Sequence, residues 1–173
     1  MGINFSKYEL LEMSLLNQIN ATLGAIGSTM RYKRTPEPIP GCESLQNKTL
    51  TMIDDNVSVL ECFAPDLLVA TNGKAHFINQ QGQSLENSAK SILNSNPNVV
   101  LVDYNLSKRF KGAQIVKSIR EKGFNGFIFG FSSENNGAVK QEFMSAGANG
   151  CIYKDTGNIE ESIQELAMLV SQD

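Results

Sequence analysis

The sequence contains no tryptophan, one histidine and three cysteines among 173 residues, and each scarcity counts against a class of protein. The single histidine, His76, argues against a histidine-based metal centre and against a Ser-His-Asp triad. An odd number of widely spaced cysteines predicts free thiols and a reducing compartment, so we expect a cytoplasmic protein. All apolar runs are shorter than the ~18 residues that a membrane span needs.

Charge is also limited, with 15 basic and 18 acidic residues and a net charge of −3. This balance lacks the basic patch with which proteins bind nucleic acid, so we expect no nucleic-acid partner. Hydrophobic residues make up 41% and charged residues 19%, which is typical of a globular chain. The length suits one domain, or a smaller domain with an appendage, whose core needs no disulfide or metal.

The N-terminal region differs from the rest of the chain. Apolar residues recur at helical spacing over 5–30, which predicts one amphipathic helix interrupted near Gly24 or Gly27. Residues 31–43 carry three prolines at alternate positions, which predicts an extended linker. Two interpretations of the helix stay open: it contacts another molecule, for example as a homodimer, or it packs on the surface of its own chain.

From residue 49 onward, short apolar runs alternate with helical patterns. The sequence predicts strands at 50–53, 75–79, 98–102, 126–131 and 150–153, and helices at 57–71, 84–94, 112–122, 137–146 and 159–170. This alternation is typical of an α/β fold with a five-stranded, doubly wound parallel sheet. Pro65 and the Asn72-Gly73 pair leave an alternative to the first of these helices, a hairpin turning on Asn72-Gly73. We therefore divide the chain into residues 1–45, helix and linker, and 46–173, the folded domain.

Polar residues follow four of the five predicted strands. Asp54-Asp55, Asp103 and Ser132 end three of them, and Lys154 follows the last. Parallel strands bring their carboxyl ends to one edge of the sheet, where such folds place their functional sites. Three carboxylates lying close together need a cation between them, and oxygen ligands suit Mg²⁺. A carboxylate beside the ion can act as a nucleophile toward phosphorus, so the set indicates phosphoryl transfer to an aspartate.

Four motifs in this order resemble the receiver domain of two-component response regulators over about residues 48–171. They are Met52-Ile53-Asp54-Asp55, Val99-Val100-Leu101-Val102-Asp103-Tyr104-Asn105-Leu106, Phe129-Gly130-Phe131-Ser132-Ser133 and Ala146-Gly147-Ala148-Asn149-Gly150-Cys151-Ile152-Tyr153-Lys154. The resemblance implies a flavodoxin-like receiver fold, here with an added N-terminal helix.

The resemblance also implies roles for individual residues. Asp103 corresponds to the phosphoacceptor, Ser132 to the switch hydroxyl, and Lys154 to the lysine that pairs with the phosphoacceptor. A histidine kinase or histidine phosphotransfer protein is the implied donor, and signalling passes to a downstream protein by direct contact. Such a domain catalyses its own phosphorylation and dephosphorylation. Because the receiver-like region ends about three residues before Asp173, we expect no DNA-binding output domain.

A magnesium site is implied by the same comparison. Asp54 and Asp55 correspond to residues that hold Mg²⁺ directly or through water. Asp103 and the backbone carbonyl of Asn105 complete the implied ligand set.

Two departures from the family pattern, at Cys151 and Asp155, favour an alternative, a degenerate receiver that acts as a phosphorylation-independent interaction or dimerisation module. Cys151 stands where the family often has an aromatic switch residue. Asp155 follows Lys154 where the family usually has proline, so we expect a trans peptide bond there. The segment 107–111 is basic and lacks the usual proline and acidic residue.

Overall fold

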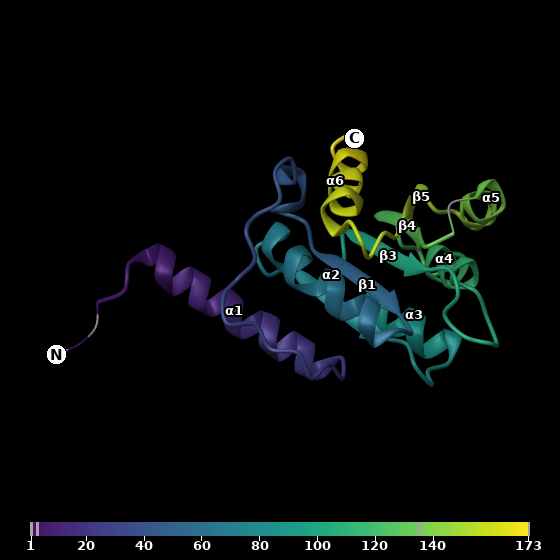
Figure 1. The fold of residues 1–173 in the computed structure, drawn as a ribbon. Coiled ribbons are helices and arrows are strands. Elements are labelled where there is room, and N and C mark those ends of the chain that lie inside the picture. Colours follow the sequence, from purple (N-terminus) through teal and green to yellow (C-terminus); the bar gives the residue numbers. More distant parts are fainter. Residues whose placement is uncertain (1, 3, 135, 173) are drawn as a thin grey trace.

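The computed structural model describes residues 2, 4–134 and 136–172 (Figure 1). Its strands form one parallel sheet in the order β2-β1-β3-β4-β5. The strand order reverses between β1 and β3: β2 lies on one side of β1, and β3, β4 and β5 follow on the other. Open α/β sheets bind their ligands at such a switch point. The strands are β1 (Leu50–Asp54), β2 (Ala75–Asn79), β3 (Val99–Asp103), β4 (Phe127–Ser132) and β5 (Gly150–Tyr153).

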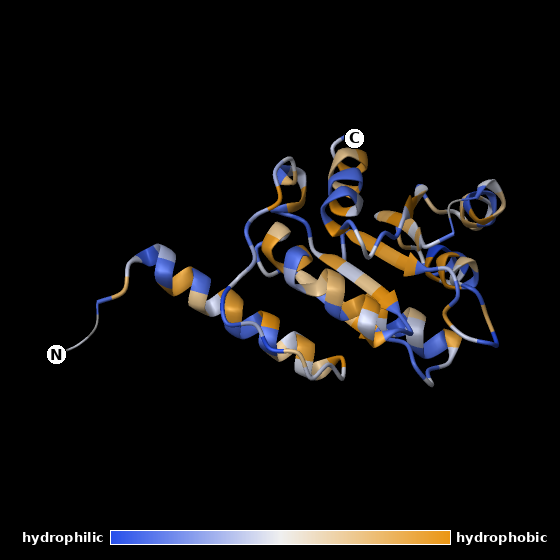
Figure 2. Cartoon of the chain, in the orientation of Figure 1, coloured by the Kyte–Doolittle hydropathy of each residue, from blue (hydrophilic) through white to orange (hydrophobic). Residues whose placement is uncertain are grey.

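Helices cover both faces of this sheet, so the predicted doubly wound α/β fold is confirmed. Helices α2 and α6 pack on the face that presents Met52 and Leu101, and α3, α4 and α5 pack on the face that presents Val100 and Val102. The central strands are apolar along their length because both faces are buried (Figure 2). The helices are α1 (Lys7–Ala25), α2 (Val57–Ala70), α3 (Leu85–Asn94), α4 (Gly112–Glu121), α5 (Gly137–Ala146) and α6 (Ile159–Val170), with a short 3-10 turn η1 (Glu43–Leu45).

The helical spacing predicted a helix over residues 5–30, and the observed helix α1 is shorter, from Lys7 to Ala25. A capping box starts it: the backbone N–H of Ser6 donates to the Glu9 carboxylate at 2.7 Å, and the Glu9 N–H donates to the Ser6 hydroxyl. The helix ends at Ala25 because Gly27 adopts a φ of +90°, in the left-handed region that terminates helices. The predicted interruption near Gly27 is therefore the end of the helix.

The hairpin alternative at Asn72-Gly73 is wrong. Strands β1 and β2 pair in parallel, with Asp54 opposite Asn79. Helix α2 connects the two strands along the chain, and it contains Pro65, which is buried. Asn72 and Gly73 have φ values of 51° and 82°, so they form the left-handed stop after the helix.

The N-terminal segment folds back along the sheet domain. Helix α1 buries Ile19 and Leu23 in the same apolar cluster as α2. The segment that follows α1 has no regular structure until η1, where Leu45 is buried. Across the described residues, the helices lack the combination of length and apolar character that crossing a membrane requires.

A substitution at Gly130 in β4 would show how tightly α5 packs on the sheet. A Cβ atom there would collide with the ring of Phe143, which is fully buried. We expect Gly130→Ala to lower the free energy of unfolding by about 2 kcal/mol, because the core must shift to admit a methyl group. Gly137→Ala, in open space at the start of α5, is the control and should change it by less than about 0.5 kcal/mol. Urea denaturation measures both, and equal effects would contradict this packing.

Candidate functional site

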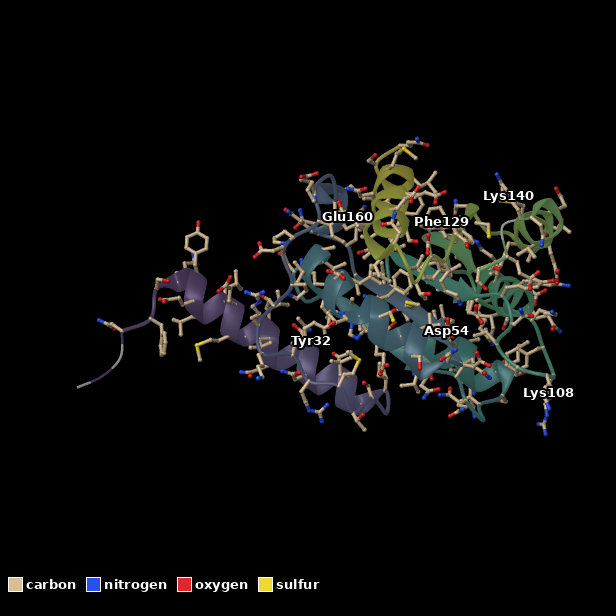
Figure 3. All side chains as sticks on the ribbon, in the orientation of Figure 1. Tyr32, Asp54, Lys108, Phe129, Lys140 and Glu160 are labelled. Carbon is tan, nitrogen blue, oxygen red and sulfur yellow. The ribbon has the colours of Figure 1, made fainter. Side chains whose placement is uncertain are left out.

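Strand ends place three charged side chains together at one edge of the sheet. Asp54 ends β1 and Asp103 ends the neighbouring strand β3. Lys154 directly follows β5, and its ammonium reaches past β4 to both carboxylates. Its Nζ lies 2.9 Å from Asp54 Oδ2 and 2.5 Å from Asp103 Oδ1. Figure 3 shows Asp54 at this end of the sheet.

Asp55 joins the two buried acids. One carboxylate oxygen from each of Asp54, Asp55 and Asp103 lies within 4.8 Å of the others. Burial, followed by the charge of Asp103, raises the pKa of Asp54 to about 6, and the same two causes raise the pKa of Asp55. The backbone N–H of Asn56 donates to Asp54 Oδ1 at 2.9 Å and holds that side chain in place. Three acids facing one ammonium form an all-oxygen donor set of the kind that suits Mg²⁺.

Lys154 is the only basic side chain that bonds to this acid cluster among the described residues. Burial acts to lower its pKa, but the charges of Asp103 and Asp54 raise it, and the net shift is upward. The ammonium is therefore charged at neutral pH. The backbone N–H of Lys154 also donates to the Ser132 carbonyl at 2.7 Å, which joins the loop after β5 to the end of β4.

Ser132 and Asn105 lie in the loops beside the acids. Ser132 is buried, and its hydroxyl oxygen accepts the backbone N–H of Glu134 at 3.0 Å. Asn105 is exposed, in the loop directly after Asp103. Its side-chain amide donates to Glu134 at 3.3 Å and accepts from the Lys111 ammonium at 2.7 Å. The loops after β3 and β4 are thus joined through Glu134.

Cys151 and Asp155 lie farther along the same rim. Cys151 is half-buried in β5, where it pairs with Gly130. It lines a cavity of about 130 Å³ together with Lys140 and Tyr153, between β5 and the start of α5. Cis peptide bonds are absent from the described residues, so the bond between Lys154 and Asp155 is trans, as the missing proline predicted.

Sequence reasoning missed a side-chain network around Tyr104. The Tyr104 hydroxyl donates to Glu142 of α5 at 2.7 Å, and its ring packs edge-on against Phe143 with centroids 5.8 Å apart. The Lys111 ammonium lies 4.4 Å from the ring centroid. The signal was an aromatic residue directly after Asp103 at a strand end. Its partners, 38 and 39 positions along the chain, could not be identified from periodicity.

Gly112 lets α4 begin close to the acids. Its N–H donates to the Tyr104 carbonyl at 2.8 Å, and a Cβ atom there would collide with the carbonyl of Asp103.

The sequence model of the response regulator receiver domain matches residues 50–166. The chain belongs to this family.

Solved structures of other receivers share the fold at low identity. The receiver domain of the histidine kinase CKI1 from Arabidopsis thaliana, complexed with Mg²⁺ and BeF3⁻, is 16% identical with a TM-score of 0.56, covering 75% of this chain and 97% of that chain. The Francisella response regulator 1452 receiver domain is 17% identical with a TM-score of 0.54, covering 73% and 98%. The BeF3-activated DrrB receiver domain is 17% identical with a TM-score of 0.55, covering 71% and 97%. No curated protein matches the sequence.

The buried contact of Lys154 with Asp54 and Asp103 should contribute to the stability of the folded receiver. Lys154→Met leaves Asp54 and Asp103 buried without their shared counter-charge, so we expect the free energy of unfolding at neutral pH to fall by about 3 kcal/mol in metal-free buffer. The matched control is Lys117→Met, which removes an exposed ion pair with Glu121 and should cost less than about 0.5 kcal/mol. Urea denaturation compares the two variants. Similar values would mean that Lys154 does not stabilise the acids.

Proposed function

We propose that this receiver is a phosphoacceptor that takes a phosphoryl group from phosphohistidine onto Asp103. The observation that supports this most directly is the placement of one buried ammonium between Asp54 and Asp103, beside a third carboxylate. An isolated structural ion pair needs two partners only. A surplus of acids around one lysine instead suits a site that receives a cation and an anionic phosphoryl group in turn.

Asp103, Lys154 and Ser132 have different roles in the proposed phosphoryl transfer. Asp103 is the nucleophile: one of its oxygens bonds to phosphorus as the bond from phosphorus to the donor nitrogen breaks. Lys154 holds Asp103 in position, and its ammonium then neutralises charge on the transferred group. Ser132 accepts a hydrogen bond from Glu134, which leaves its own hydroxyl hydrogen free to donate to a phosphoryl oxygen.

The acid cluster fits a magnesium ion. Asp54, Asp55 and Asp103 offer carboxylate oxygens, and the backbone carbonyl of Asn105 is a fourth candidate ligand. A Mg²⁺ ion held by these oxygens would supply positive charge against the negative charge that develops on the phosphoryl oxygens. Asp54 is held by the Asn56 N–H and by Lys154, so its carboxylate is already oriented.

The proposed partners follow from this chemistry. The donor is a histidine kinase or histidine phosphotransfer protein, and the signal passes to a downstream protein by contact; a second copy of the chain is a further partner, at α1. Lys108, on the loop after β3, points away from the sheet and can attract an acidic donor surface (Figure 3). We place the protein in the cytoplasm, where its three free cysteines would stay reduced.

Phosphorylation can be tested directly. We expect incubation with acetyl phosphate and Mg²⁺ to add one phosphoryl group, measured as intact mass, and Asp103→Asn to abolish the addition. Asp155→Asn, beside Lys154 but outside the acid cluster, is the control and should still be labelled. A wild-type protein that gains no phosphoryl group, and forms no beryllofluoride adduct, would contradict the proposal.

Magnesium binding predicts a separate change in stability. At an ion concentration about 100 times its Kd, the free energy of unfolding should rise by about 2.7 kcal/mol relative to EDTA, because only the folded chain assembles the site. Asp55→Asn removes one ligand from a half-exposed position and should greatly reduce this gain. Asp66→Asn changes an acid on α2 outside the cluster and should keep it. Thermal or urea unfolding with and without Mg²⁺ gives the comparison; an equal gain in both variants would place the ion elsewhere.

A degenerate receiver is the second candidate function. Cys151 in place of a ring at β5, and Asp155 in place of proline after Lys154, favour it. In that case the chain would act as a phosphorylation-independent interaction module. The mass measurement separates the two functions, because a degenerate receiver gains no phosphoryl group at Asp103.

A further inference from the structure

Lys111 lies beside the acid cluster but outside the contacts that hold the cluster together. It directly precedes Gly112, where an added Cβ atom would collide with the carbonyl of Asp103. The backbone at this lysine therefore lies close to the strand end that carries the proposed phosphoacceptor. Its ammonium lies 2.7 Å from the side-chain oxygen of Asn105, which follows Asp103 in the same loop. Both ends of the Lys111 side chain are thus near the acid site.

The Lys111 ammonium has neutral partners. It donates to the Asn105 amide oxygen and lies 4.4 Å from the centroid of the Tyr104 ring. Within the described parts of the chain, no carboxylate oxygen lies close enough to form an ion pair with it. An ammonium without a carboxylate partner can exchange such contacts for a phosphoryl group, whose charged oxygens are stronger acceptors than a neutral amide.

The backbone at this lysine is fixed, while its side chain is free to move. The Lys111 N–H donates to the Gln114 side chain at 2.9 Å, and the Gly112 N–H donates to the Tyr104 carbonyl at 2.8 Å. The side chain itself is exposed and has a flexible four-carbon stem. Lys108, on the same loop, points away from the sheet (Figure 3). Lys111 can therefore move its ammonium toward the acids without rearranging the backbone.

The charges of a phosphorylated site leave room for a further cation. Asp54 and Asp55 as carboxylates, together with a phosphoryl group of charge about −2, supply about four negative charges. A magnesium ion and the Lys154 ammonium supply about three positive charges against them. About one negative charge remains, and the Lys111 ammonium, bonded to Asn105, is placed to balance it.

We propose that Lys111 is a phosphoryl-binding residue, a second ammonium that contacts the phosphoryl group on Asp103. The inference rests on the proposed function, because it assigns a further residue to the same site. When Asp103 is phosphorylated, the Lys111 ammonium leaves the oxygen of Asn105 and donates to a phosphoryl oxygen. Lys154 reaches the group from the loop after β5 and Lys111 reaches it from the start of α4, so two separate loops hold it.

A purely structural role for Lys111 would act through Asn105. The Asn105 amide donates to Glu134 at 3.3 Å, and the Glu134 N–H donates to the Ser132 hydroxyl at 3.0 Å. Lys111 would then position these groups without contacting a phosphoryl oxygen. Removal of the Asn105 side chain separates the two roles, because it breaks this series of contacts and leaves the ammonium in the chain.

Labelling by acetyl phosphate and binding of beryllofluoride, both with Mg²⁺, test the inference. In labelling, an Asp103 oxygen bonds to phosphorus while the bond from phosphorus to the acetate oxygen breaks, and acetate leaves with that electron pair. We expect Lys111→Met to slow labelling, followed by intact mass, and to weaken beryllofluoride binding, measured by titration calorimetry, each by about tenfold. Lys111→Arg should stay within about threefold of wild type, because it keeps the positive charge.

The matched control is Lys117→Met, which removes the same charge from an exposed position farther along α4, where the lysine pairs with Glu121. It should change both measurements by less than about twofold. At about 1 M salt, where the screening length is about 3 Å, the difference between Lys111→Met and wild type should shrink to about threefold or less. A lysine that only positioned Asn105 would respond far less to salt.

Asn105→Ala provides the second comparison. In this background Lys111→Met should again weaken beryllofluoride binding by about tenfold. No further loss would mean that Lys111 acts through Asn105, and it would overturn the inference. Equal results for Lys111→Met and Lys117→Met, with wild type labelled, would overturn it as well and leave the proposed function intact. A wild type that is not labelled and binds no beryllofluoride would overturn both.

Discussion

The contact of the Lys154 ammonium with Asp54 and Asp103 is the interaction on which the rest of the site depends. It joins residues 100 and 51 positions apart, and it requires β1, β3 and β5 to lie in one parallel sheet. Both carboxylates are buried, so neither would remain ionised at low cost without this counter-charge. The third acid, Asp55, increases the excess of carboxylates over the single ammonium. A site built this way favours an incoming cation, and the sheet supplies the rigidity that keeps the acids close.

Close packing around the acids limits which residues the surrounding loops can contain. Gly112 permits α4 to start against the carbonyl of Asp103, and Gly130 permits α5 to lie on β4 through the ring of Phe143. Tyr104 then connects the loop after Asp103 to the same helix through Glu142. The loop that carries the proposed phosphoacceptor is therefore attached to α5 by a ring contact and a hydrogen bond, while Cys151 leaves a small cavity on the neighbouring rim.

The N-terminal segment combines an anchored part and a free part in one helix. Burial of Ile19 and Leu23 attaches it to the receiver, beside α2 and the edge strand β2. The earlier turns extend past the receiver with their apolar side chains exposed. One of the two interpretations of this helix, packing on its own chain, holds for its second half, while contact with another molecule stays a prediction for the exposed turns. The acid site and the projecting turns occupy separate parts of the molecule.

The sequence by itself determined the fold class and the residues at the strand ends. Period-two and period-3.6 patterns report which face of an element is buried, and this information is local, so the α/β alternation and the positions of Asp54, Asp103, Ser132 and Lys154 were predictable. Only the tertiary structure decided contacts between distant segments. The parallel pairing of β1 with β2 excluded the hairpin at Asn72-Gly73. The left-handed conformation of Gly27 ended α1 earlier than the helical spacing predicted. Tyr104 forms its hydrogen bond with Glu142, which lies 38 positions further along the chain. These outcomes depend on strand order and on the free energy of packing summed over the whole chain, which no local pattern encodes.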